Sequence, residues 1–171
     1  MGWIKLAGTG MILAASLWAG LHAALRLRRS YEELRDLLAA LELMAGEISF
    51  AAPPFVPLCR RAGEGRCPAV RRFFEQMALE GSCPEADPEG RTRRICAETG
   101  LLLPGSALLP LERLFDDFGR YDREGQLRQL GLAAGELKSL TDELGSQLAN
   151  RCKSYALLGL SAGTAVLVLV L

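Results

Sequence analysis

The feature that most constrains this chain is its C-terminal run, Tyr155–Leu171, which contains no charged side chain. It follows an amphipathic stretch whose apolar residues recur at three- and four-residue steps, which places them on one face of a helix. These residues are Leu127, Leu130, Ala134, Leu137, Thr141, Leu144 and Leu148, with Thr141 the one polar member. At about 1.5 Å per residue the run spans roughly 25 Å, the short end of what a bilayer core requires. The sequence therefore predicts a helix that enters a membrane.

A second apolar stretch, Leu6–Leu25, lies near the N-terminus and is followed at once by three arginines, Arg26, Arg28 and Arg29. A cleaved signal peptide would carry its positive charge before the apolar core and a small-residue cleavage site after it. Here only Lys5 precedes the core, and no such site follows. We therefore expect a retained transmembrane helix over residues 1–25.

The charged residues indicate the topology. Apart from Lys5, all of them lie between Arg26 and Lys153, and basic residues stand at both borders of this segment. The positive-inside rule then predicts a cytoplasmic domain over 26–154, between transmembrane helices over 1–25 and 155–171 of a cell-membrane protein. Its five cysteines include no CxxC pair, which argues against zinc and for buried or half-buried thiols in a reducing compartment: Cys59, Cys67, Cys83, Cys96 and Cys152.

The fold class is predicted to be all-α, because helical periodicity recurs and apolar and polar residues do not alternate as in strands. A helix over Ser30–Phe50 either begins at a capping box of Ser30 and Glu33 or continues the first membrane helix without a break. Further helices are expected over Phe55–Ala62 and Ala69–Leu79, from Pro88 to about Glu98, from Pro110 to Gly119, and after a capping Asp122. Together these make a cytoplasmic helical bundle between two terminal transmembrane helices.

Catalytic and cofactor templates are missing from the sequence. The single histidine, His22, lies in the first apolar stretch, so the charged segment has no Ser/His or Cys/His pair and no HExxH site. It also lacks a GxxxxGK phosphate loop, and its charge shows no basic excess for nucleic acid. Asp116 and Asp117 are adjacent and are expected to be solvated. We therefore expect no enzyme activity, cofactor, metal site or nucleic-acid partner.

Small residues spaced four apart predict close helix packing, because they allow two helix backbones to approach. The second apolar run contains Gly159 and Gly163, and the first contains Ser16 and Gly20. Gly131 and Gly135 repeat the spacing in the amphipathic helix, where each glycine costs about 1 kcal/mol of helix propensity relative to alanine. Packing against a neighbour would offset that cost.

Three segments carry a resemblance to a known family. They are LELMAGEISF before the proline pair at 53–54, FGRYDREGQ over Phe118–Gln126, and KSYALLGLSAG at the start of the last run. With these and the two-span layout, the chain resembles the stage III sporulation protein AB family over nearly its whole length. Phe118 before Gly119 stands where the family has leucine. The residues most specific to the resemblance are Gly119, Asp122, Gln126, Tyr155 and Leu158.

The resemblance implies a membrane component, on the mother-cell side, of the apparatus linking mother cell and forespore. The family is similar to F-type platform proteins of type II secretion and type IV pilus systems, which meet a secretion ATPase. Implied partners are other stage III sporulation membrane proteins, the ATPase called stage III sporulation protein AA, and a second copy of the chain. A membrane-anchored helical signalling adaptor unrelated to secretion is the alternative function.

A cluster of arginines on the second and third predicted cytoplasmic helices is the candidate partner surface. Its members are Arg60, Arg61, Arg66, Arg71 and Arg72. Arginine suits docking because its planar fork pairs bidentately with carboxylates. The sequence leaves two interpretations open: a docking surface for the ATPase, or a solvated face near anionic lipid head groups.

Overall fold

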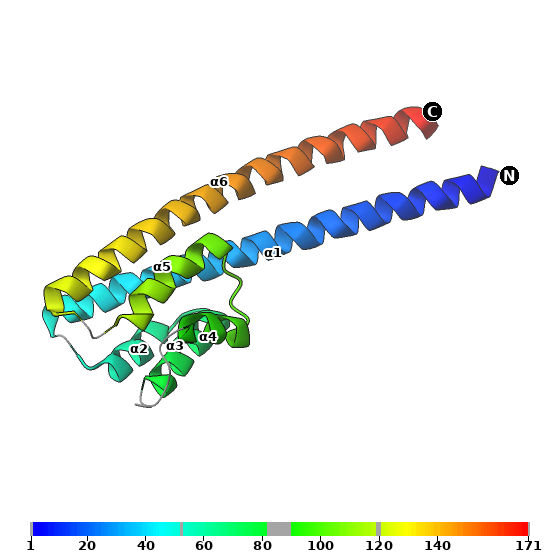
Figure 1. The fold of residues 1–171 in the computed structure, drawn as a ribbon. Helices are drawn as coiled ribbons and strands as arrows, with labels where there is room; N and C mark the ends of the chain where they lie inside the picture. Colours follow the sequence, from blue (N-terminus) through cyan, green and yellow to red (C-terminus); the bar gives the residue numbers. More distant parts are fainter. Residues whose placement is uncertain (1, 52, 82–89, 119–120, 171) are drawn as a thin grey trace. The chain divides into compact units, whose positions relative to one another are not determined.

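The computed structural model describes the backbone of residues 2–51, 53–81, 90–118 and 121–170, and the side chains of Trp18, 22–51, 53–81, 90–118 and 121–148. Throughout these residues the secondary structure consists of helices, with no strand, which confirms the all-α prediction. The helices are α1 (Gly2–Phe50), α2 (Phe55–Gly63), α3 (Pro68–Glu80), α4 (Arg91–Thr99), α5 (Gly105–Asp116) and α6 (Arg123–Val170) (Figure 1).

The chain divides into two compact units. One comprises Ser30–Glu143, which we call the helical domain, and the other comprises the terminal segments Met1–Arg29 and Leu144–Leu171. Among the described residues, no helix combines the length and apolar character needed to cross a membrane. Most side chains of the predicted spans, 1–25 and 155–171, lie outside those described, as do the predicted packing and family residues Ser16, Gly20, Tyr155, Leu158, Gly159 and Gly163.

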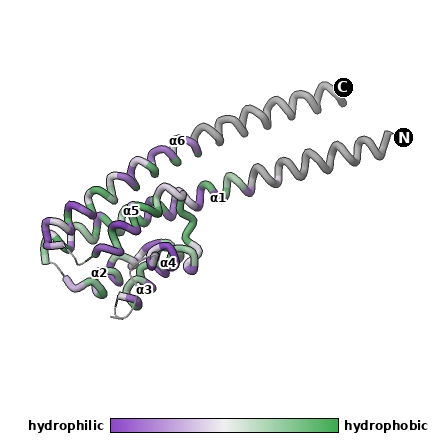
Figure 2. The backbone as a smooth tube through the Cα atoms, viewed as in Figure 1, coloured by the Kyte–Doolittle hydropathy of each residue, from purple (hydrophilic) through white to green (hydrophobic). Residues whose placement is uncertain are grey.

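The helix α1 runs through Ser30 without interruption, so the second of the two alternatives for this helix is correct. The sequence spacing predicts a buried face of Leu34, Leu37, Leu38, Leu41, Met44 and Ile48. All of these residues are buried except Leu38, which is half-buried. The described parts of α1 and α6 alternate between hydrophilic and hydrophobic colours along their length, as expected of helices with one buried face (Figure 2).

The predicted capping box at Ser30 does not form, because α1 continues through Ser30 and no helix begins there; Glu33 instead bonds to another backbone group. Its carboxylate is buried and accepts a hydrogen bond of 2.6 Å from the N–H of Leu102, in the connection before α5. One turn on, Asp36 accepts a 2.7 Å bond from the N–H of Cys67 at the start of α3. Hydrogen bonds to charged groups contribute about 1.5–3 kcal/mol each. These two acids therefore tie distant segments of the helical domain to α1.

An aromatic cluster fills the centre of the helical domain. Phe73 and Phe74 of α3 and Phe115 of α5 are fully buried, with ring centroids 5.3–6.1 Å apart in edge-on arrangements. The cluster continues outward, because Phe115 stacks on Phe118 at 6.5 Å and Phe118 meets Phe55 of α2 at 4.8 Å. Such pairs add about 0.5–1.5 kcal/mol beyond their burial. The sequence spacing predicts Val70, Phe73, Phe74 and Met77 as the inward residues of α3, and all four are buried.

The start of α5 differs from the prediction. The helix begins at Gly105 and contains Pro110 in its interior, whereas the sequence placed Pro110 at the first position. Pro104 precedes the helix as its N-cap residue, and Pro110 is itself buried beside Leu111. Proline inside a helix removes one backbone hydrogen bond. Burial of the apolar face to which Pro110 belongs, starting at Ala107, offsets that loss.

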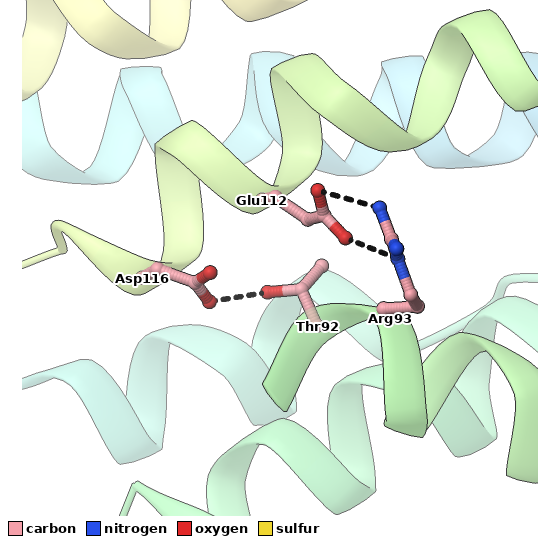
Figure 3. Close-up of polar contacts among 4 residues, drawn as sticks. All are labelled: Thr92, Arg93, Glu112 and Asp116. Carbon is pink, nitrogen blue, oxygen red and sulfur yellow. Dashed lines mark hydrogen bonds and ion pairs between the residues drawn. The ribbon is translucent and has the colours of Figure 1, made fainter. Parts of the chain in front are cut away.

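Polar contacts fasten α4 to α5 (Figure 3). The Thr92 hydroxyl donates a 2.9 Å hydrogen bond to Asp116, and Arg93 forms an ion pair of 2.8 Å with Glu112. Burial raises the pKa of the Asp116 carboxyl, while the Thr92 hydrogen bond opposes that rise. The prediction that Asp116 is simply solvated is therefore wrong, because packing of α4 against α5 half-covers it.

Candidate partner-binding surfaces

The five predicted arginines separate into two groups. Arg60, Arg61, Arg71 and Arg72 are exposed on α2 and α3, which pack directly against each other. Arg60 and Arg71 line a common surface hollow of about 400 Å³, which also contains Glu64 and Glu75. We call the four exposed arginines the α2–α3 patch.

Two members of the α2–α3 patch take part in ion pairs. Arg61 contacts Glu47 of α1 at 2.8 Å, and Arg71 contacts Glu75 one turn away at 2.8 Å. Both arginine side chains are more than half exposed, at 60% and 66%. Exposed pairs of this kind contribute only about 0–1 kcal/mol. Their guanidinium groups can therefore exchange an internal carboxylate for one on a partner at little cost to the fold.

Arg66, unlike the four exposed arginines, contacts the backbone of α1. It is half-buried and donates a 3.1 Å hydrogen bond from its terminal nitrogen to the carbonyl of Ala39 in α1. Its Nε is buried with no hydrogen-bond partner among the described groups. Sequence reasoning grouped it with its neighbours because spacing alone does not reveal which side of the short connection between α2 and α3 faces the core.

The three cysteines whose side chains the structure describes are free thiols and are largely covered. Cys59 and Cys96 are buried, Cys67 is half-buried, and none of the three forms a disulfide. Burial raises the pKa of the Cys59 and Cys96 thiols to about 12, and it also raises that of Cys67. The predicted covered thiols are confirmed at these positions. Among the side chains that the structure describes, no group of three or more His, Cys, Asp or Glu is arranged to hold a metal ion.

The start of α6 is a capped helix terminus. Asp122 accepts a 3.0 Å hydrogen bond from the N–H of Gly125, which confirms the predicted cap. The side-chain amide of Gln126 donates a 3.2 Å bond to the carbonyl of Tyr121. A Cβ on Gly125 would lie 2.8 Å from the Asp122 carboxylate, so glycine is needed for this close approach. Gly119 lies outside the described residues.

Gly131 and Gly135, the predicted packing pair of α6, are both exposed. A Cβ added at either position would meet no atom within 4 Å. In the described part of the chain, no neighbouring helix uses the close approach that this pair permits.

A second concavity, of about 460 Å³, lies where the N-termini of α2, α4 and α6 meet. Sequence reasoning missed it because its lining comes from separate segments and no local pattern unites them. Its lining residues are Pro53, Pro54, Phe55, Gly81, Arg91, Phe118, Arg123 and Gln126. We call it the N-terminal cleft.

A family model described as stage III sporulation protein AB matches residues 5–171. The chain belongs to the stage III sporulation protein AB family. The family is named for stage III of sporulation. Membership in it supports a role of this chain in sporulation.

A solved structure of stage III sporulation protein AB shares this fold. It aligns with a TM-score of 0.61 at 16% sequence identity, covering 71% of this chain and 97% of the other. Among curated proteins no significant match was found. Of the residues that carry the sequence resemblance to the family, Asp122 and Gln126 are both occupied in organising the start of α6.

Proposed function

We propose that this stage III sporulation protein AB family member is a non-enzymatic membrane component of the sporulation apparatus between mother cell and forespore. The helical domain faces the mother-cell cytoplasm, and the two terminal helices anchor it in the membrane. Support comes from the family match, from the two apolar terminal runs, and from the basic residues that flank them on the side of the domain.

We further propose that the domain acts as a platform that docks a secretion-type ATPase, stage III sporulation protein AA. The observation that carries this proposal is the α2–α3 patch, in which four arginines are exposed on two helices packed side by side. Their internal ion pairs are weak and exposed. An acidic surface on the ATPase can therefore replace them with bidentate contacts.

Charged surfaces of this kind chiefly set the association rate and its salt dependence. Binding of the purified ATPase should weaken as ionic strength rises, because exposed charges are screened over about 10 Å at 0.1 M salt. The double variant Arg71→Glu/Arg72→Glu should lower affinity at low salt by tenfold or more, since like charges would then face each other; tenfold corresponds to about 1.4 kcal/mol.

The matched control is Arg113→Glu/Arg128→Glu, which makes the same charge change at two exposed arginines of α5 and α6. It should leave binding within about threefold of wild type, a difference under 1 kcal/mol. Equal losses in both double variants would reduce the effect to net charge. An affinity that neither salt nor the Arg71/Arg72 reversal alters would exclude the α2–α3 patch as the docking surface.

A further inference from the structure

The N-terminal cleft combines cationic and aromatic side chains in one cavity. Arg91 is the first residue of α4, Arg123 is the first residue of α6, and both line the cleft. Phe55 and Phe118 also line it, with ring centroids 4.8 Å apart. None of its described lining residues is an aspartate or a glutamate. The cleft volume of about 460 Å³ lies within the range of about 300–1,000 Å³ typical of ligand sites.

Both guanidinium groups retain free hydrogen-bonding capacity. Arg91 donates from a terminal nitrogen to the Phe115 carbonyl at 3.0 Å, and its buried Nε has no partner among the described groups. Arg123 donates from its Nε to the carbonyl of Ile48 at 3.0 Å. Each guanidinium carries five N–H donors in a fixed fork. The backbone contacts therefore fix the two side chains in place while other donors stay available to an anion.

Two of the three helix N-termini at the cleft, those of α2 and α4, add positive potential, whereas that of α6 is capped by Asp122 and carries Glu124 in its first turn. Neither α2 nor α4 has a side-chain cap or an acidic residue in its first turn. The partial positive charge of a helix N-terminus favours a nearby anion. Asp116, a carboxylate that interacts electrostatically with Arg91, bonds to Thr92 and does not line the cleft. The two arginines, their spare donors and the uncapped N-termini of α2 and α4 favour an anionic ligand.

We propose that the N-terminal cleft binds an acidic peptide segment of a partner protein, with a carboxylate at Arg91 and Arg123 and a neighbouring apolar side chain against Phe55 and Phe118. The apolar walls, completed by Pro53 and Pro54, distinguish a peptide from a simple anion. A phosphate cradle uses glycine-rich backbone. The single glycine here, Gly81, instead lies against Phe55, since a Cβ on it would be 2.7 Å from that ring.

This binding site is independent of the α2–α3 patch. None of the lining residues of the N-terminal cleft belongs to the patch. The charge reversal proposed for Arg71 and Arg72 should consequently leave the cleft intact. Failure of either proposal is distinguishable from failure of the other.

N-acetyl-phenylalanine is a suitable probe, because it joins one carboxylate to one aromatic ring. The full chain, labelled with ¹⁵N-arginine and held in detergent micelles, is titrated with the probe to about 50 mM, which detects millimolar affinity worth about 4 kcal/mol. We expect saturable shifts of the Nε–H signals of Arg91 and Arg123. The neutral amide of the probe and inorganic phosphate should each bind at least about tenfold more weakly, a difference of about 1.4 kcal/mol.

Gln126→Glu tests the site with a nearly isosteric change, because Gln126 lines the cleft and its replacement adds a negative charge there, besides removing the hydrogen bond donated to the Tyr121 carbonyl. We expect probe affinity to fall by about tenfold or more, since like charges at a binding site are strongly unfavourable. Gln129→Glu is the control, one turn along α6, at a residue that does not line the cleft but lines an adjoining hollow that shares Phe118 and Gln126 with it. It should change affinity by less than about threefold, under 1 kcal/mol.

Three results would overturn the proposal: no saturable shift of either arginine signal, equal binding of the acid and its amide, or tighter binding of phosphate. Equal effects of the two glutamine substitutions would also contradict it, because the anion would then respond to overall charge. An unchanged circular dichroism spectrum for both variants verifies that the comparison concerns folded protein.

Discussion

Replacing Gly131 and Gly135 by alanine should stabilise the helical domain. Both positions lie in the interior of α6, both are exposed, and an added Cβ meets no atom within 4 Å at either. Alanine exceeds glycine in helix propensity by about 1 kcal/mol, in part because it restricts the unfolded chain. With no clash to oppose that gain, each substitution should add about 1 kcal/mol and the pair about 2 kcal/mol.

Thermal unfolding of residues 30–143, followed by circular dichroism, measures this gain. For a domain of roughly a hundred residues, 1 kcal/mol raises Tm by about 4–8 °C. Gly125→Ala is the matched control in the same helix, because its Cβ would lie 2.8 Å from both Asp122 and Tyr121. Loss of the N-cap bond there costs about 1 kcal/mol and cancels the propensity gain. We therefore expect no increase in Tm for Gly125→Ala.

A Tm that falls in the Gly131→Ala/Gly135→Ala variant would refute the reasoning, because the added methyl groups would then meet something. A second measurement concerns the predicted helix packing. If another molecule packs on this pair, the stabilised variant of the full chain should lose that association in crosslinking. The substitutions would then raise the stability of the domain and weaken its association. The two glycines would thus lower helix stability but permit a contact with another molecule.

Two other predictions concern titration and labelling. Burial raises the pKa of Asp116 above its ordinary 3.8, so the folded state holds the proton more tightly and loses stability as pH rises through this window. Relative to wild type, Asp116→Asn should therefore be more favourable at pH 7 than at pH 3 in urea unfolding; an opposite trend would contradict this. If the domain is cytoplasmic, a membrane-impermeant maleimide should label Cys67 only after permeabilisation, whereas buried Cys59 should stay unlabelled either way.

The sequence predicted much of the fold because periodicity records burial. The inward residues of α1 and α3 follow directly from three- and four-residue spacing, and all of those in α3 are fully buried: Val70, Phe73, Phe74 and Met77. Helix ends were harder to locate, because proline is common at a first position and Pro104 and Pro110 are six residues apart. The backbone shows that α5 already begins at Gly105, before Pro110.

The candidate sites were less predictable, since they depend on which segments meet. Clustering in the sequence identified the α2–α3 patch but could not separate Arg66, whose bond to Ala39 is a tertiary contact. The N-terminal cleft is assembled from helix termini far apart in the chain, among them Arg91 and Arg123. No spacing rule joins those residues. Asp116 was misjudged for the same reason, because its partner Thr92 belongs to another helix.

The hydrogen bond between Glu33 and Leu102 has a consequence for synthesis of the chain. The two residues are 69 positions apart, and Arg123 meets Ile48 across 75 positions. At about 5–20 residues per second, the ribosome needs roughly 4–15 seconds to deliver these partners after α1 has emerged. During that interval the apolar face of α1 has no completed domain to cover it. Its exposure time is set by translation, and slower translation between α1 and α6 would prolong the period in which the nascent chain can aggregate.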